Sequence, residues 1–130
     1  RLPLLFARVL DALVPGGLFV FDLAEPGQVP PGSINQHFTE GDGWTVLVEK
    51  QEDTATDLLS RRIVSFLRQR GADGDLYRRD EEIHHLRLYR PEETVSALRE
   101  AGFAVQVKQG YGLWELPPAH SIFVATKPAI

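Results

Sequence analysis

The sequence has no cysteine and no methionine in its 130 residues. Without cysteine, the protein can form no disulfide, no thiolate zinc site and no cysteine nucleophile. Long apolar runs are missing too: the longest covers only a few positions, so no segment is expected to span a membrane. No charged stretch followed by an apolar one marks a secretion signal. We therefore expect a cytoplasmic protein.

Positive charge is also in short supply. Lysine and arginine total 14 against 18 aspartates and glutamates, which gives a net charge of −4. Nucleic acids and anionic membranes are bound through an excess of basic residues, so neither is expected as a partner. A hydrophobic content of 43% over 130 residues is enough to bury one core. Residues 1–130 are therefore expected to form a single domain or part of one.

The first segment, residues 1–23, predicts a helix followed by a buried strand. Apolar residues recur at helical spacing up to Leu13, and Pro15 with two glycines ends the helix. The stretch Leu18–Leu23 is apolar on both faces up to Asp22, which is typical of a central parallel strand covered by helices. Because the sequence opens inside such an α/β crossover, we expect it to be the truncated back half of a larger fold.

The middle of the chain changes character. Residues 24–43 are rich in proline and glycine and are expected to form a loop. Within 44–89, three stretches mix apolar and polar residues with a partial period of two, at 44–51, 58–70 and 76–89. The turns between them are expected at 53–56 and 72–75, where Asp73-Gly74 is a strong hairpin signal. These features predict three antiparallel strands, with a helix as the alternative for 58–70.

The last segment, residues 90–130, predicts a helix and a terminal pair of strands. Pro91 suits the first turn of a helix, and Gly102 suits its end. Strands are expected at 103–109 and 121–127, joined by a loop that holds Tyr111 and Trp114.

The order of these segments resembles the C-terminal half of class I S-adenosylmethionine-dependent methyltransferases. The likeness is carried by VLDALVPGGLFVFDL at 9–23, RPEETVSALREAGFAV at 90–105 and SIFVATKP at 121–128. The resemblance implies an α/β fold with part of a Rossmann-like sheet, namely its last three strands plus helices. The three-stranded antiparallel segment at 44–89 would be an insertion on the substrate side. Such insertions are similar to those of small-molecule methyltransferases, including N-methyltransferases of deoxyamino sugars.

The resemblance also implies a cofactor, S-adenosylmethionine, and a small-molecule N or O acceptor of the methyl group. The family's glycine-rich cofactor loop has no counterpart in this sequence. We therefore expect the parent protein to bind the cofactor, and this chain alone neither to bind it nor to be active. The chain would supply part of the acceptor pocket.

The most polar cluster lies in the last predicted strand of the insertion. Glu81, His85 and Arg87 would share one face, where they could hold a polar substrate or act as a general base. The alternative is a set of solvated charge pairs on an exposed sheet. A turn at Asp73-Gly74 would place Arg62 opposite His85. Adjacent His84 and His85 point to opposite faces of a strand, so no shared metal ion is expected.

Three more residues are candidates for the acceptor pocket. Asp22 lies near the end of the first strand, where ligands reach the crevice of open α/β sheets, or it caps the following loop. Tyr111 and Trp114 could form the wall of an apolar pocket or pack as a lid on the core. A further set of arginines could attract phosphate, but neighbouring acids largely cancel it: Arg61, Arg62, Arg68, Arg70, Arg78 and Arg79.

Two alternative functions remain open on the sequence. The chain could be a non-catalytic association module, because loss of the front half would expose one side of strand 18–23 and favour a homodimer or a domain-swapped assembly. It could also be an unrelated α/β ligand-binding domain.

Overall fold

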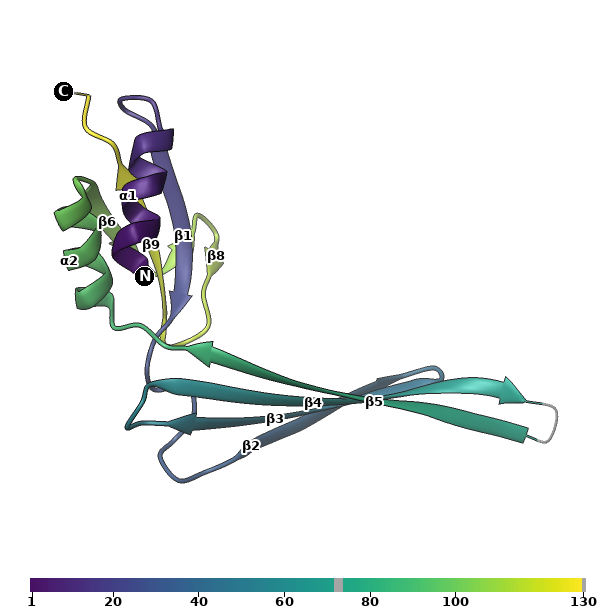
Figure 1. The fold of residues 1–130 in the computed structure, drawn as a ribbon. Helices are drawn as coiled ribbons and strands as arrows, with labels where there is room; N and C mark the ends of the chain where they lie inside the picture. Colours follow the sequence, from purple (N-terminus) through teal and green to yellow (C-terminus); the bar gives the residue numbers. More distant parts are fainter. Residues whose placement is uncertain (72–73, 130) are drawn as a thin grey trace. The chain divides into compact units, whose positions relative to one another are not determined.

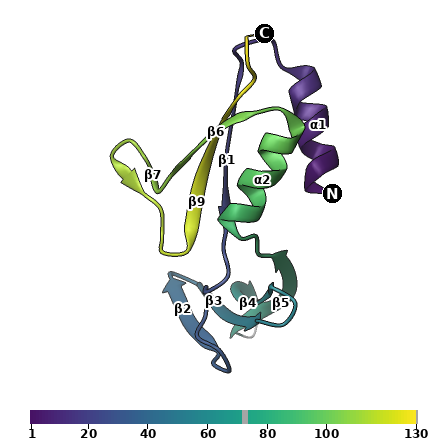
Figure 2. The same cartoon turned by 90° about the vertical axis from the view of Figure 1, so that its left-hand side faces the viewer.

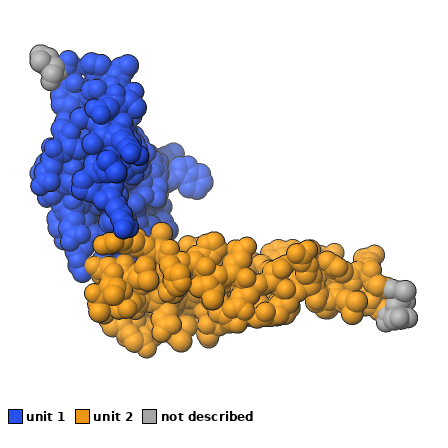
Figure 3. Space-filling model, viewed as in Figure 1, with its two compact units in different colours: residues 1–26, 88–130 blue, residues 27–87 orange. Residues whose placement is uncertain are grey.

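The computed structural model describes residues 1–71 and 74–129. The chain divides into two compact units, of which unit 1 is Arg1–Pro26 with Leu88–Ile130 and unit 2 is Gly27–Arg87 (Figure 3). Within unit 1, the segment just before unit 2 and the segment just after it are joined by a backbone hydrogen bond, from Tyr89 N to Ala24 O at 3.1 Å. Among the described residues, no helix is long and apolar enough to cross a membrane.

Unit 1 contains two helices, a three-stranded sheet and a small hairpin (Figure 1). The sheet has the order β1-β9-β6, and both of its pairings are antiparallel. The elements are α1 (Leu2–Ala12), β1 (Leu18–Ala24), α2 (Pro91–Ala101), β6 (Ala104–Lys108), β7 (Gly110–Tyr111), β8 (Trp114–Glu115) and β9 (His120–Thr126).

The core of unit 1 lies between the two helices and one face of this sheet (Figure 2). Phe6 of α1 is buried and contacts Phe19 and Phe21 of β1, with ring centroids 6.2 and 5.6 Å apart. Phe21 stacks on Phe123 of β9 at 5.2 Å. Such aromatic pairs stabilise a core by about 0.5–1.5 kcal/mol beyond the burial of their area. Leu98 of α2, with no exposed surface, is also part of this cluster.

Strand β1 differs from the buried parallel strand that its sequence predicts. Its described partner is β9, to which it runs antiparallel, and its side chains alternate in burial. Leu18 and Val20 are exposed, whereas Phe19 and Phe21 face the core. The physical reason is that both described helices of unit 1 pack on the same face of the sheet.

The ends of the helices follow their sequence signals. Pro91 occupies the first turn of α2, and Gly102 ends the helix with a φ of +115°, a conformation that favours glycine. A Cβ at Gly102 would also lie 3.1 Å from Leu10 Cδ2. At the end of α1, the Lys127 ammonium donates hydrogen bonds of 2.8 Å to the carbonyls of Leu10 and Leu13. The cation therefore lies at the carbonyl end of the helix, where positive charge is favourable.

Unit 2 is a four-stranded antiparallel sheet of order β2-β3-β4-β5. Its strands are β2 (Asn35–Gly41), β3 (Trp44–Asp53), β4 (Leu58–Gly71) and β5 (Gly74–Arg87). The segment 58–70, for which a helix was the alternative, is therefore a strand. The turn after β3 lies where it was expected, and the Asp53 carboxylate accepts a hydrogen bond from Ala55 N there.

Strand β2 corrects the expectation of a loop over residues 24–43 and adds a fourth strand to the antiparallel segment. All seven of its residues are exposed, so it carries no buried apolar face that the sequence could signal. It pairs with β3 through a two-residue turn at Asp42-Gly43, where Gly43 has a φ of +77°. Backbone pairing across this glycine turn, rather than side-chain burial, forms the strand.

The pairing of β4 with β5 is shifted by two residues from the predicted register. Ser60 lies opposite His85 and Arg62 opposite Ile83, where Arg87 and His85 were expected. The described pairs end with Gly71 opposite Gly74. Residues 72–73 of the predicted turn lie outside the described residues. A register shift of two residues leaves each side chain on its predicted face of the sheet, because side chains alternate between the faces with a period of two.

Candidate functional site

The carboxyl end of β1 carries the first candidate pair. The Tyr111 hydroxyl donates a 2.9 Å hydrogen bond to Asp22 Oδ2, which joins the β7–β8 hairpin to the sheet. This hydrogen bond raises the pKa of the Tyr111 phenol, and partial burial and the negative charge of Asp22 raise it further. The phenol therefore stays protonated and remains a donor, while the carboxylate remains an acceptor.

A second group of polar side chains lies at the same end of the sheet. Ser121, which is buried, donates a hydrogen bond to the Glu25 carboxylate and accepts one of 3.3 Å from the Gln109 amide. The sequence reasoning missed these three residues. Only their positions could have indicated them, because Glu25 directly follows β1 and Ser121 lies in β9 opposite Leu23. They hold the ends of β1 and β9 together and add a carboxylate close to Asp22 along the chain.

The β7–β8 hairpin borders a hollow of about 590 Å³, which is lined by residues 108–110, 112 and 115–118 and by neither Tyr111 nor Trp114. Tyr111 and Trp114 pair across the hairpin, but their roles differ. Tyr111 is tied to Asp22, whereas 79% of the Trp114 surface is exposed. In unit 1 the described structure therefore joins Asp22 to Tyr111 and leaves Trp114 as an exposed aromatic surface.

In unit 2, Glu81 is held by two arginines. The Arg62 guanidinium donates to Glu81 Oε1 at 2.9 Å, and Arg79 donates to Oε2 at 3.1 Å. Arg62 also bonds Glu49 on the next strand, at 3.2 Å. The hydrogen bond from Arg62, followed by that from Arg79, lowers the pKa of the Glu81 carboxyl. A carboxylate stabilised in this way is a weak proton acceptor, which favours a structural or anchoring role over general-base work.

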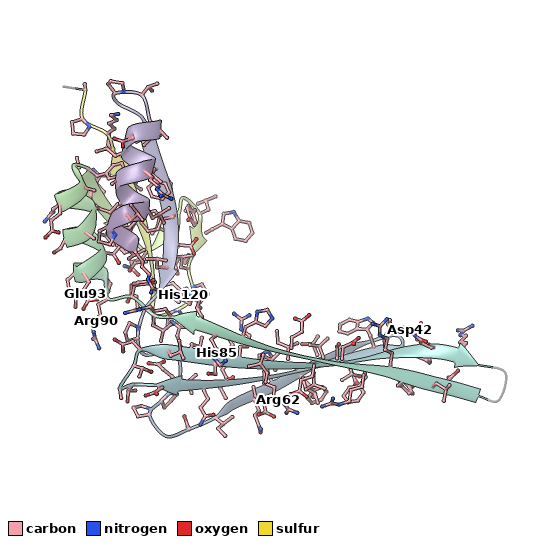
Figure 4. All side chains as sticks on the ribbon, in the orientation of Figure 1. Asp42, Arg62, His85, Arg90, Glu93 and His120 are labelled. Atoms are coloured by element: carbon pink, nitrogen blue, oxygen red, sulfur yellow. The ribbon has the colours of Figure 1, made fainter. Side chains whose placement is uncertain are left out.

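His85 lies opposite Ser60, and their side chains are within hydrogen-bond distance, 3.1 Å from Nδ1 to Oγ. Figure 4 shows His85 and Arg62 projecting from the sheet of unit 2. The register places Glu81, His85 and Arg87 at alternate positions of β5, so they share one face as predicted. The Glu81 carboxylate contacts Arg62 of β4 and Arg79 of β5, and His85 contacts Ser60 of β4.

The predicted site residues therefore fall into two groups. Asp22, Tyr111 and Trp114 belong to unit 1, while Glu81, His85 and Arg87 belong to unit 2. Within the described residues, no group of three or more histidines and acids is placed to hold a metal ion.

Comparison with known structures decides the fold. No protein-family model and no curated protein sequence matches the chain. Among solved structures, an S-adenosylmethionine-dependent methyltransferase from Clostridium acetobutylicum matches 95% of this chain with a TM-score of 0.73 and 22% identity. The chain has the fold of a partial methyltransferase domain. It spans 49% of that protein, about half its length.

Two further methyltransferases show the same relationship. A sugar N-methyltransferase from Streptoalloteichus matches 95% of the chain, with a TM-score of 0.65, 22% identity and 47% of its own length covered. An amino pentose methyltransferase from Micromonospora echinaspora, solved with S-adenosylmethionine bound, matches 96% of the chain. Its TM-score is 0.68 at 20% identity, with 50% of its length covered. The methyltransferase fold therefore includes both the helical unit and the antiparallel insertion.

Proposed function

We propose that this chain is part of an S-adenosylmethionine-dependent methyltransferase that methylates a nitrogen or oxygen of a small molecule. The observation that carries the proposal is the match of at least 95% of the chain to about half of several such enzymes. That two of these enzymes are named for sugar substrates supports a small polar acceptor. The chain would supply the acceptor side of the domain.

The polar end of β1 supports this assignment. In open α/β sheets, ligands bind beyond the carboxyl ends of the strands, where Asp22 and Glu25 lie. The Asp22 carboxylate can accept a hydrogen bond from an amine or hydroxyl of the acceptor, and Tyr111 fixes its orientation. In methyl transfer, protein groups act mainly by aligning the acceptor with the methyl group. We assign that positioning to Asp22 and Tyr111.

S-Adenosylmethionine, when bound, supplies the electrophilic methyl group. The described residues of this chain do not fit the cofactor, because the connection from β5 to α2 at 88–90 contains no glycine. A glycine-rich strand-to-helix turn lets backbone approach such a cofactor closely. We therefore assign cofactor binding to parts of the domain outside this chain.

Calorimetry with S-adenosylhomocysteine tests the proposal. We expect a parent protein that contains this chain to bind the compound with one site per domain, and the chain alone to show no heat of binding. A parent protein that does not bind it would contradict the methyltransferase assignment. Binding by the chain alone would contradict the assignment of cofactor binding to other parts of the domain.

An association module is the second candidate, favoured by one observation. β1 lies at the end of the order β1-β9-β6, and Leu18 and Val20 are exposed along it. A strand with an unpaired edge and apolar side chains tends to pair with another chain. A homodimer or a domain-swapped assembly through 18–23 would satisfy that edge.

A further inference from the structure

The structure separates the arginines of β4 and β5 into paired and unpaired ones. Four of them form ion pairs with acids: Arg62 with Glu49 and Glu81, Arg68 with Asp42 and Asp75, Arg78 with Asp80, and Arg79 with Glu81. Arg61 has no such partner within the part of the chain that the structure describes. The near-cancellation of charge expected for this hairpin therefore fails at Arg61.

A second unpaired cation lies next to Arg61. Lys50 of β3 is directly opposite Arg61 in the β3–β4 register. Residues opposite each other in an antiparallel pair have Cβ atoms about 4.5–5.5 Å apart, and like charges there destabilise the sheet. Lys50 also lacks an ion pair among the described residues, and both side chains are only partly exposed. The sheet thus keeps two close positive charges that it does not neutralise.

The acids nearest to these cations on the same face are already engaged. The Glu52 carboxylate accepts hydrogen bonds of 2.7–3.1 Å from the backbone N–H groups of 27–29. The Glu82 carboxylate contacts His84 Nε2 at 3.0 Å. Glu52 lies two positions after Lys50 on β3. Glu82 lies two positions before His84, the β5 residue directly opposite Arg61. Among the described residues, neither carboxylate forms an ion pair with Lys50 or Arg61.

The Arg61 guanidinium also carries an unsatisfied atom. Its Nε is buried and has no hydrogen-bond partner. A buried N–H without an acceptor is rare in folded proteins because it loses its hydrogen bonds to water without replacement. Within the described residues, the Arg61 side chain is therefore left without an acceptor for this N–H, and the two cations are left without an ion-pair partner.

We propose that Lys50 and Arg61 form a binding site for a phosphoryl group, either as free phosphate or carried on a small molecule. Arginine presents a planar fork of donors that matches phosphate oxygens, and lysine adds a compact positive charge. A dianion would offset both cations. The site does not depend on the proposed methyl transfer. The net charge of −4 favours a small anion over nucleic acid.

Titration with inorganic phosphate and with glucose 1-phosphate, at constant ionic strength, tests the site. Two-dimensional NMR spectra should show saturable shifts at the backbone amides of Lys50 and Arg61. Lys50→Gln and Arg61→Gln should each weaken binding about tenfold, the value of one charge-assisted hydrogen bond. The matched control is Arg78→Gln, which removes a cation already paired with Asp80, and it should change affinity less than twofold.

The two phosphate sources are distinguished by their relative affinities. Tighter binding of glucose 1-phosphate indicates a phosphorylated small molecule, and equal binding indicates phosphate itself; both support the site. Shifts that do not saturate, or equal weakening by Arg78→Gln and Arg61→Gln, would overturn it. Tighter binding of a single-stranded oligonucleotide, lost in both variants, would also overturn it in favour of nucleic acid.

Thermal unfolding gives a readout that a purely structural role would not produce. Without anion, Lys50→Gln should unfold at the same temperature as the unaltered chain or higher, because it relieves like-charge repulsion. With saturating phosphate, the unaltered chain should gain stability and the variant should not. A variant that is less stable without anion, and gains equally with phosphate, would assign Lys50 to folding alone.

Discussion

Asp22 and Tyr111 are 89 positions apart in the sequence, and a single side-chain hydrogen bond joins them. The sequence placed both among the candidates for an acceptor pocket, from the strand end and the aromatic loop, but nothing in either segment indicated that they would meet. Long-range contacts of this kind depend on how β7 folds back toward the sheet. The interaction can be tested in the chain itself.

Tyr111→Phe removes the hydroxyl and leaves the ring. Since the bond is partly exposed, we expect the free energy of unfolding to fall by about 0.5–1 kcal/mol, measured by urea denaturation. Asp22→Asn should lower the pKa of Tyr111 toward its ordinary value, since the carboxylate is the main cause of the rise. Absorbance titration of the phenol measures this change. An unchanged titration in Asp22→Asn would show that the two side chains do not interact in solution.

Glu81 gives a prediction at acid pH. Its pKa is lowered in the folded chain, so its ion pairs stabilise the fold above the unfolded-state value of roughly 4.3. This stabilisation is lost as the pH falls through the still lower folded-state value. Glu81→Gln should therefore flatten the fall in urea midpoint on acidification. Arg62→Gln should flatten it similarly, because Arg62 is the main cause of the shift. A full acid dependence in both variants would contradict the assignment.

At the level of elements, both long helices and most strands were predictable, including β5, whose residues are all exposed, whereas β2 was not. α2 begins at Pro91 and ends at Gly102 as its sequence indicates, because proline and glycine restrict or permit particular backbone angles. β2 could not be predicted from burial, since all of its residues are exposed. Its one local signal, the Asp42-Gly43 turn, lies within a stretch whose prolines and glycines favour a loop. The β4–β5 register was wrong by two residues, because it was predicted from the Asp73-Gly74 turn signal, whereas Gly74 belongs to β5.

The packing of α2 on the sheet gives a test at the same scale. Leu98 has no exposed surface and belongs to the core of unit 1. Leu98→Ala should lower the free energy of unfolding by about 2–5 kcal/mol, because it removes buried surface and leaves a cavity. Leu113→Ala is the matched control, since Leu113 in the β7–β8 turn is fully exposed, and it should change stability by less than about 0.5 kcal/mol. Equal losses would show that α2 does not pack as described.

For the whole molecule, the exposed edge and face of β1 predict self-association. We expect sedimentation velocity at increasing concentration to show a dimer of the chain. Val20→Lys should shift the chain to monomer, because a charged side chain on a strand edge opposes pairing with another strand. Leu113→Lys adds the same charge away from β1 and should leave the dimer intact. A monomer at all concentrations would contradict the association proposal.

The hydrogen bond from Tyr89 N to Ala24 O has a consequence for how such a protein can diversify. The stretch from Gly27 to Arg87 leaves unit 1 after Pro26 and rejoins it at Leu88, and the aromatic core contains only residues of unit 1. Unit 2 is therefore one continuous insertion in the chain, and none of its residues belongs to the core of unit 1. A lineage could replace or lengthen it without rebuilding the core, so new ligand preferences could arise by changing one continuous stretch of the gene.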